Sequence, residues 1–258
     1  MDRLQEGLRT KSLGRNILFS HSVASTNDWA RELAKLSAPE GTVAIAETQT
    51  SGRGRLSRKW VSPIGGLWFS VILRPKLPAN KAAKLVFAAG LAVAEVLREL
   101  YSLPAETKWP NDVLVHDRKV CGILTEMNTT GKKVNYAIVG VGINANFNAK
   151  VFPDSLRETV TSLETKLGRK IRLEELFKAL LERLECLYGL FLSGGSGSIL
   201  DRWKSYAGFL GHQVEVAGQT ERLSGLAVDV DNEGALILRL EDGAMKRVLA
   251  GDVSLKKR

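Results

Sequence analysis

The chain has 258 residues, of which 44% are hydrophobic and 25% are charged, and its formal net charge is +9. These values predict one large globular domain, or one domain with a small appendix, and the absence of a long apolar run excludes a membrane-spanning helix. The two cysteines, Cys121 and Cys186, and the charged N-terminus predict a cytoplasmic protein without a disulfide framework or a signal peptide. The three histidines lack metal-ligand spacing, so no zinc site is expected.

Short strands and helices alternate along the first hundred residues. Ser25 has the position of an N-cap, with Asp28 three residues later, and should begin an amphipathic helix. Runs that are rich in valine, isoleucine and threonine predict strands. The predicted strands cover residues 16–20, 42–47 and 67–73, and a long helix runs from Pro78 to about Leu100.

The middle of the chain has the pattern of consecutive hairpins. Strands at 113–115 and 120–126 flank a polar turn, and a second turn at 128–131 precedes a strand over 133–142. Consecutive hairpins predict an α+β fold, with helices on one face of a mixed or antiparallel sheet.

The C-terminal third begins with a long amphipathic helix and continues with short alternating strands. The helix covers residues 173–192, and the serine- and glycine-rich segment 193–198 is the best linker candidate. From residue 208, about five short strands separated by turns predict a small β-barrel or curled sheet that packs on the main domain. We therefore predict one domain over residues 1–206 and a second over 207–258.

The most informative stretch is the basic loop of residues 52–60, Gly-Arg-Gly-Arg-Leu-Ser-Arg-Lys-Trp. Glycines allow close approach of the backbone to a ligand, and arginine forks match phosphate and carboxylate oxygens. Because the cations repel one another without an anion, we expect this loop to be mobile when empty and ordered around a phosphorylated or adenylated ligand. A solvated basic surface loop is an equally good interpretation of the segment taken alone.

Three other motifs have an ordinary structural interpretation when each is considered separately. Asp112, in the Lys-Trp-Pro-Asn-Asp motif of 108–112, is a magnesium ligand or proton acceptor if phosphates lie nearby, and otherwise a turn residue. Lys119 fits an edge strand, whereas Gly122 inside a strand indicates close approach of a ligand or another backbone. Segment 140–145 formally matches the dinucleotide fingerprint, but the asparagines that follow are poor helix formers, so we reject this match.

Taken together, these motifs resemble the biotin–protein ligase family. The matching pieces, in the family's order, are Ser25-Thr26-Asn27, Gln49, the loop 52–60, and the segments 108–112, 119–124 and 140–144. The resemblance covers roughly residues 16–147, and the C-terminal part resembles more loosely the SH3-like domain of the family. It implies a class II synthetase-like catalytic domain and a two-step reaction with biotin, ATP and Mg²⁺. Biotin becomes biotinyl-5′-AMP and is then transferred to a lysine of a biotin carboxyl carrier protein domain.

The resemblance also implies roles for individual residues. The biotin-binding set would be Ser25, Thr26, Asn27, Gln49, Gly52, Arg53, Lys119 and Gly122. The ATP- and adenylate-binding set would be Arg55, Arg58, Trp60, Asn111, Lys119 and Asn144, and the catalytic set Lys119, Arg55 and Asp112, with Asp112 as a base toward the target lysine. About twenty residues precede Ser25, so we expect neither the DNA-binding domain of the bifunctional members nor sequence-specific DNA binding. A homodimer is a further expectation from the resemblance.

Two alternative functions stay open at this point. A lipoate–protein ligase or octanoyltransferase shares the fold and is disfavoured by the arginine-rich loop. A basic nucleic-acid-binding module could use the positive charge and the five tryptophans to contact phosphates and stack on bases.

Overall fold

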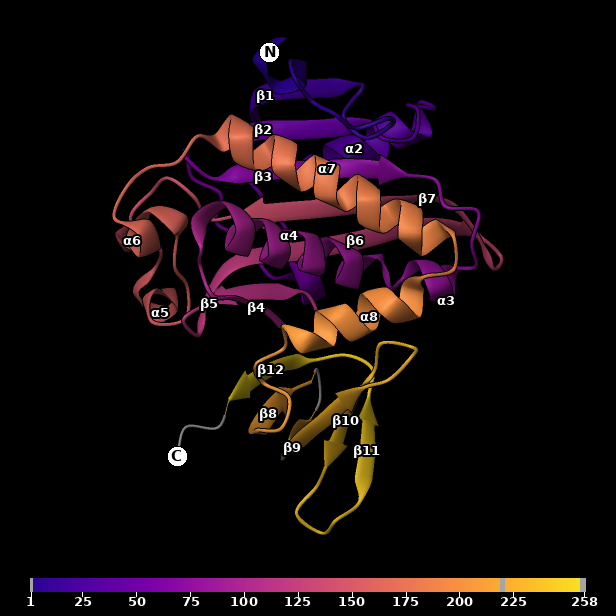
Figure 1. Cartoon of the computed structure of the whole chain (residues 1–258), viewed down its shortest axis with the longest axis vertical. Helices are drawn as coiled ribbons and strands as arrows, with labels where there is room; N and C mark the ends of the chain where they lie inside the picture. Colours follow the sequence, from indigo (N-terminus) through magenta and orange to yellow (C-terminus); the bar gives the residue numbers. More distant parts are fainter. Residues whose placement is uncertain (1, 219–220, 256–258) are drawn as a thin grey trace.

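The computed structural model describes residues 2–218 and 221–255, which form a large mixed sheet with helices and a smaller antiparallel sheet (Figure 1). The large sheet has the strand order β1-β2-β3-β7-β6-β5-β4, in which β1 and β2 are parallel and all other neighbours antiparallel. Its strands are β1 (Ile17–Val23), β2 (Val43–Gln49), β3 (Leu67–Leu73), β4 (Ala105–Lys108), β5 (Asp112–Val115), β6 (Arg118–Thr130) and β7 (Lys133–Ile143). The predicted α+β class is confirmed.

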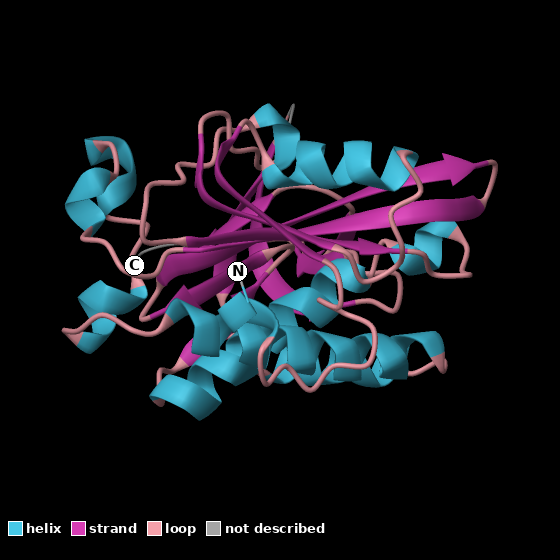
Figure 2. Ribbon diagram, turned by 90° about the horizontal axis from the view of Figure 1, so that it is seen from above, coloured by secondary structure: helices cyan, strands magenta, loops and turns pink. Residues whose placement is uncertain are grey.

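Helices cover both faces of this sheet, although unequally, as the view from above shows (Figure 2), so the predicted placement of helices on one face is wrong. Long apolar helices α4 (Leu85–Tyr101) and α7 (Leu173–Leu192) pack with the sheet in the main core, and α8 (Ser196–Ser205) packs beside them. On the opposite face, α2 (Thr26–Lys35) packs on Ala44, Ile72 and Ile138 in a separate small cluster. The short helices are α1 (Asp2–Gln5), α3 (Ala79–Ala82), α5 (Asp154–Arg157) and α6 (Leu163–Leu167), with 3₁₀ turns η1 (Arg55–Ser57) and η2 (Ala149–Val151).

The C-terminal strands form a five-stranded antiparallel sheet in the order β11-β10-β9-β8-β12. They are β8 (Gln213–Ala217), β9 (Arg222–Val230), β10 (Leu236–Arg239), β11 (Met245–Val248) and β12 (Asp252–Leu255). The predicted number of strands is confirmed, and β11 and β12 are the two edges of the sheet. The indole Nε1 of Trp109, at the end of β4, donates to the Gly234 carbonyl oxygen at 3.0 Å and ties this sheet to the large one.

Three details of the sequence prediction differ from the structure. The helix predicted from Pro78 is broken at Ala83–Lys84 into α3 and α4. The predicted linker is only a short turn, because residues 196–205 form α8, which packs on α4. The short edge strand β4 was not predicted, since four residues carry too little alternation to be recognised. We still propose the domain boundary between residues 206 and 207, which falls between α8 and β8.

A buried carboxylate joins the three helices on the main core face. Glu95 of α4 has 5% of its side chain exposed and contacts Arg183 of α7 at 2.6 Å and Arg202 of α8 at 2.5 Å. We expect Glu95→Ala to lower the free energy of unfolding by about 3 kcal/mol, because it leaves two guanidinium groups without their shared partner. Urea denaturation measures this change.

The neighbouring Glu99 provides the matched control for that substitution. It also contacts Arg183 at 2.6 Å, but 56% of its side chain is exposed. Glu99→Ala should therefore cost less than about 1 kcal/mol. Equal costs for the two variants would show that burial of Glu95 does not decide its contribution.

Among the residues that the structure describes, we find no helix whose length and apolar character would let it cross a membrane.

Candidate functional site

Three glycines form the floor of a cavity on the sheet face that α2 covers only in part. Gly122 of β6 lies opposite Gly142 of β7. Gly140 precedes Gly142 by two residues on β7 and therefore lies on the same face. A Cβ on Gly142 would lie 2.6 Å from the indole Nε1 of Trp60, and one on Gly140 would lie 1.9 Å from the Oδ1 of Asn27. Glycine is therefore required wherever these two side chains rest on the sheet.

The indole of Trp60 lies directly on this glycine floor. It contacts Trp68 of β3 edge-to-face, with ring centroids 6.3 Å apart, and the ammonium of Lys119 stands 5.0 Å from its ring centroid. Its Nε1 is buried and makes no hydrogen bond with the described residues. The loop predicted from sequence thus ends in an aromatic ring that lines the same slot as Gly122 and Gly142.

A polar cradle lies at the start of α2, beside the glycine floor. Ser25 is the N-cap, and the backbone N–H and hydroxyl of Thr26 donate to Gln49 Oε1 at 2.8 and 3.1 Å. Asn27 Oδ1 accepts from the hydroxyl of Ser70, on β3, at 2.7 Å. These residues come from α2, β2 and β3, and all but Gln49 are buried. The structure brings together four polar residues of the biotin-binding set that the family resemblance implied, Ser25, Thr26, Asn27 and Gln49.

An ion pair lies at the other end of the floor. The ammonium of Lys119 is 2.6 Å from Asp112 Oδ1, and that of Lys108 is 3.8 Å from Asp112 Oδ2. Only 8% of the Asp112 side chain is exposed, whereas a quarter of the Lys119 side chain faces the cavity. Asp112 is therefore placed to hold Lys119 in position.

The basic loop forms a narrow hairpin that covers the cavity. Trp60 N donates to the Gly52 carbonyl oxygen at 2.8 Å, and Gly54 N donates to the Arg58 carbonyl oxygen at 2.7 Å. At its tip, in η1, Leu56 and Ser57 have φ values of 53° and 59°, a conformation that side chains other than glycine adopt at some cost.

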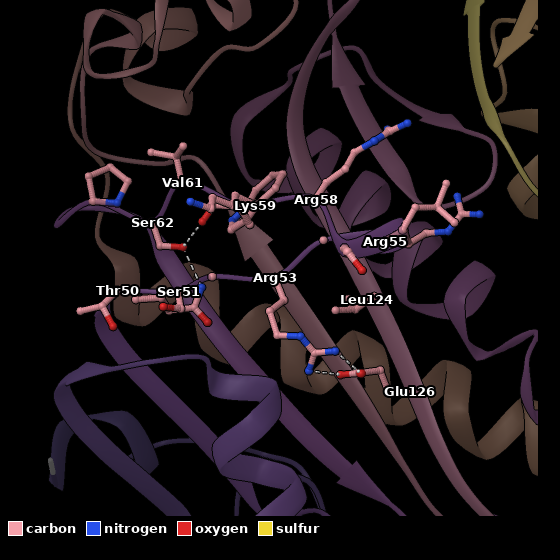
Figure 3. A pocket seen from close by; sticks show the side chains of 17 residues that line it. Thr50, Ser51, Arg53, Arg55, Arg58, Lys59, Val61, Ser62, Leu124 and Glu126 are labelled. Atoms are coloured by element: carbon pink, nitrogen blue, oxygen red, sulfur yellow. Dashed lines mark hydrogen bonds and ion pairs between the residues drawn. The ribbon is translucent and has the colours of Figure 1, made fainter. Parts of the chain in front are cut away.

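Each arginine of the loop has a carboxylate partner. Arg53 binds Glu126 at 2.8 Å (Figure 3) and Asp28 at 2.5 Å. Arg55 lies 3.8 Å from Asp252, and Arg58 forms an ion pair with the same carboxylate. The mutual repulsion expected for an empty loop is therefore offset by acidic side chains from α2, β6 and β12.

Arg55 is the most enclosed of the three arginines. It donates to Asn111 Oδ1 and to the Gly251 carbonyl oxygen, both at 3.2 Å. Burial lowers the pKa of its guanidinium, while the nearby carboxylates of Asp252 and Asp112 act in the opposite direction. An arginine remains protonated at neutral pH, so this is a fixed positive charge at the edge of the cavity.

Asn111 and Asn144 occupy different positions relative to the cavity. Asn111 lines it, and its Nδ2 donates to the Ile123 carbonyl oxygen at 2.7 Å. Asn144 is fully buried, and its Nδ2 donates to the Thr161 carbonyl oxygen at 3.0 Å. The same Nδ2 is 3.5 Å from the Lys119 carbonyl oxygen, so Asn144 supports the strand end that carries Lys119. Its contact with a nucleotide stays a prediction. Cys121 is a buried core thiol whose pKa is raised by burial, as its sequence context indicated.

The whole cavity has a volume of about 960 Å³ and extends to the C-terminal sheet. One end is apolar and glycine-floored with a polar cradle, and the other is lined by the cations of Lys119, Arg55 and Arg58. Such an arrangement can bind a neutral hydrogen-bonding ring at one end and polyphosphate at the other.

Comparison with known proteins places this geometry in a family. Residues 19–144 match the biotin/lipoate A/B protein ligase family, and residues 209–256 match the biotin protein ligase C-terminal domain. A relative from Bacillus subtilis, the bifunctional ligase/repressor BirA, is 37% identical over 250 residues, which are 96% of this chain and 77% of that protein. This chain belongs to the biotin protein ligase family. The biotin–[acetyl-CoA-carboxylase] ligase of Paracoccus denitrificans is 33% identical over 220 residues, covering 83% of this chain and 90% of that one.

A solved biotin protein ligase has the same overall structure. The enzyme from Aquifex aeolicus, in complex with biotin and ATP, superimposes with a TM-score of 0.81 at 32% identity, covering 95% of this chain and all of the other. The apo structure of that enzyme gives a TM-score of 0.77.

Two acidic residues at the site were missed by the sequence reasoning. Glu126 has the period-2 spacing that places it on the same strand face as Gly122 and Leu124, and this spacing could have revealed it. Asp252 lies in the C-terminal sheet, and no local pattern connects it with the loop 52–60.

Proposed function

We propose that this protein is an ATP-dependent ligase that activates biotin as biotinyl-5′-AMP and transfers it to a lysine of a biotin carboxyl carrier protein domain. One observation carries the proposal: the glycine floor and polar cradle lie in the same cavity as Lys119 and the loop arginines. Membership of the biotin protein ligase family and the ligand-bound Aquifex aeolicus relative support it.

The first step requires two anions to meet. An oxygen of the biotin carboxylate forms a bond to the α-phosphorus of ATP, and the bond from that phosphorus to the bridging oxygen breaks to release pyrophosphate. Because carboxylate and triphosphate repel each other, the site has to supply positive charge in an enclosed cavity. Lys119 lines the same cavity as the cradle and the arginines, so we assign it to the carboxylate and the α-phosphate, and Arg55 and Arg58 to the phosphates.

The biotin ring is assigned to the cradle. Ser25, Thr26, Asn27 and Gln49 would bind the ureido group, and Gly52 and Arg53 would close the loop over it. Gly122 and Trp60 would line the slot for the ring and its aliphatic chain, because both border the cavity and the indole rests directly on the glycine strand. The family resemblance also predicts that Trp60 lies near the nucleotide, and this stays a separate prediction.

In the second step, the amine of the carrier lysine attacks the carbonyl carbon of the mixed anhydride, and AMP leaves. Asp112 remains the proposed acceptor for the proton of that amine. Mg²⁺ would be bound through the phosphates of ATP and would help to neutralise their charge, since this ion is usually held by substrate phosphates, water and one or two carboxylates. In the part of the chain that the structure describes, no group of three or more metal-ligating side chains was found.

The two alternatives fit the structure less well. Three of the five tryptophans, Trp68, Trp109 and Trp203, are fully buried and cannot stack on bases of a nucleic acid. A lipoate-specific enzyme would have no use for a hydrogen-bonding cradle of this size around an apolar dithiolane ring.

Two measurements test the proposal. Biotin, and not lipoate, should raise the melting temperature, by an amount that grows with the logarithm of the biotin concentration. A carrier domain incubated with the protein, biotin and Mg–ATP should become reactive toward streptavidin. Stabilisation by lipoate with no labelling by biotin would contradict the assignment.

A further inference from the structure

A single carboxylate joins the loop 52–60 to the polar cradle. Glu126 lies on β6, and Figure 3 shows its side chain directed toward Arg53. Its Oε2 accepts from Asn27 Nδ2 at 2.8 Å, and its Oε1 accepts from Arg53 Nη2 at 2.8 Å. Arg31 of α2 contacts the same carboxylate at 3.1 Å. Donors from α2 and from the loop therefore converge on one side chain.

The contact with Glu126 helps to fix the orientation of the Asn27 amide. Asn27 Nδ2 also donates to the Leu124 carbonyl oxygen at 3.2 Å, while its Oδ1 accepts from Ser70. An amide with two acceptors on its nitrogen side and a donor on its oxygen side has one favourable orientation. That orientation decides whether the cavity offers a donor or an acceptor above Gly140.

The contact with Arg53 determines where the loop begins its path over the cavity. Arg53 follows Gly52, whose carbonyl oxygen pairs with Trp60 N at the other end of the hairpin. Glu126 and Asp28 raise the pKa of Arg53 against the opposing effect of its burial, so this cation is held by protein carboxylates. Arg53 is thus directed away from the phosphate-binding end, where Arg55 and Arg58 lie.

We propose that Glu126 is a positioning residue for biotin binding, which orients Asn27 in the cradle and holds Arg53 so that the loop lies over the slot. This inference rests on the proposed function and adds a residue to it. Glu126 acts through Asn27 and Arg53 and is assigned no contact with the biotin carboxylate or the α-phosphate. Its loss should therefore weaken the binding of biotin and loosen the loop 52–60, and should leave the rate of the chemical step unchanged.

The Glu126–Arg53 ion pair is partly exposed, so its removal should affect biotin binding more than the stability of the fold. Glu126 has 26% of its side chain exposed and Arg53 39%, so their attraction is screened by solvent and adds little to global stability. A glutamine at 126 would turn an NH₂ group toward Arg53 or Asn27, both of which are donors. The local geometry should change while the fold persists.

The experiment compares Glu126→Gln with two variants. Glu126→Asp keeps the charge, and Glu32→Gln removes an exposed carboxylate on α2 that pairs only with Lys35 among the described residues. Biotin-dependent exchange of pyrophosphate into ATP gives kcat and the KM for each substrate. Tryptic cleavage within residues 52–60 is followed with and without saturating biotin.

For Glu126→Gln we expect the KM for biotin to rise about 10-fold, because misoriented polar groups then face the ligand. The KM for ATP and kcat should change less than about 2-fold, and the loop should be cleaved faster even with saturating biotin. Glu126→Asp should fall between this variant and the wild type, and Glu32→Gln should match the wild type.

Unchanged biotin KM and unchanged loop cleavage in Glu126→Gln would overturn the proposal. Equal increases of both KM values, or loss of the fold, would show that Glu126 is only structural. If the wild-type protein shows no biotin-dependent exchange, the proposed ligase function fails instead, and loop cleavage without ligand still tests whether Glu126 holds Arg53.

Discussion

Lys119→Ala is expected to reduce biotin-dependent pyrophosphate exchange by about 10²- to 10³-fold, the usual loss when one preorganised charge at a reacting centre is removed. The ammonium is positioned by Asp112 at 2.6 Å and lies over the indole of Trp60. It lines the same cavity as the polar cradle and the loop arginines. The loss should appear in kcat, because the charge acts on the transition state in which the two anions meet.

The matched control for this variant is Lys133→Ala, an exposed lysine at the start of β7, for which no change is expected. Among the described residues, Lys119→Ala also leaves the largely buried Asp112 with one ion pair, to the more distant Lys108. The melting temperature of each variant must therefore be measured beside its activity. Full exchange activity in a folded Lys119→Ala protein would show that Lys119 has no role in forming the adenylate.

Periodicity predicted the large elements of the fold because each has to bury one face. The helix 173–192 agrees residue for residue with α7, and the predicted strand 67–73 with β3. The helix from Pro78 was predicted as one element because apolar spacing continues across residues 83–84, where the backbone nevertheless breaks. Strand β4 is held by tertiary partners, as its Thr107 N–H donates to the Tyr206 carbonyl oxygen at 3.0 Å.

The site was predictable to the extent that its residues cluster in motifs. Ser25, Gln49, Lys119 and Gly122 were all selected from sequence, and the structure places them around one cavity. The carboxylates that hold the loop were not found, because ion pairs between distant segments leave no local pattern. Arg58 and Asp252 are separated by nearly two hundred positions.

These carboxylates change the electrostatic description of the empty protein. Arg55 and Arg58 face Asp252, so an incoming triphosphate has to compete with a carboxylate already present. The positive charges of the loop are therefore partly neutralised before a ligand binds. As a result, the cations repel one another less than they would in a loop without carboxylate partners. The C-terminal sheet, which supplies Asp252, forms part of the cavity wall.

Gly142→Ala is expected to raise the KM for biotin about 10- to 100-fold, since overpacking of a filled site costs about 1–3 kcal/mol. The added methyl group would lie 2.6 Å from Trp60 Nε1 and 2.9 Å from its Cε2, so the indole has to leave the floor. The slot that Trp60 lines with Gly122 would then lose its shape. The KM for ATP should change much less, because the proposed phosphate ligands Arg55 and Arg58 are held by Asp252 of the C-terminal sheet.

Gly189→Ala is the matched control, because Gly189 lies within α7 and a Cβ there meets no atom within 4 Å. It should keep the wild-type KM values and raise stability slightly, as alanine favours the helix over glycine. Tryptophan fluorescence should change on Gly142→Ala and not on Gly189→Ala, since the first substitution moves an indole and the second touches none. If Gly142→Ala shifts the fluorescence but leaves the KM for biotin unchanged, then the ring position does not shape the biotin slot, and biotin must bind away from the glycine floor.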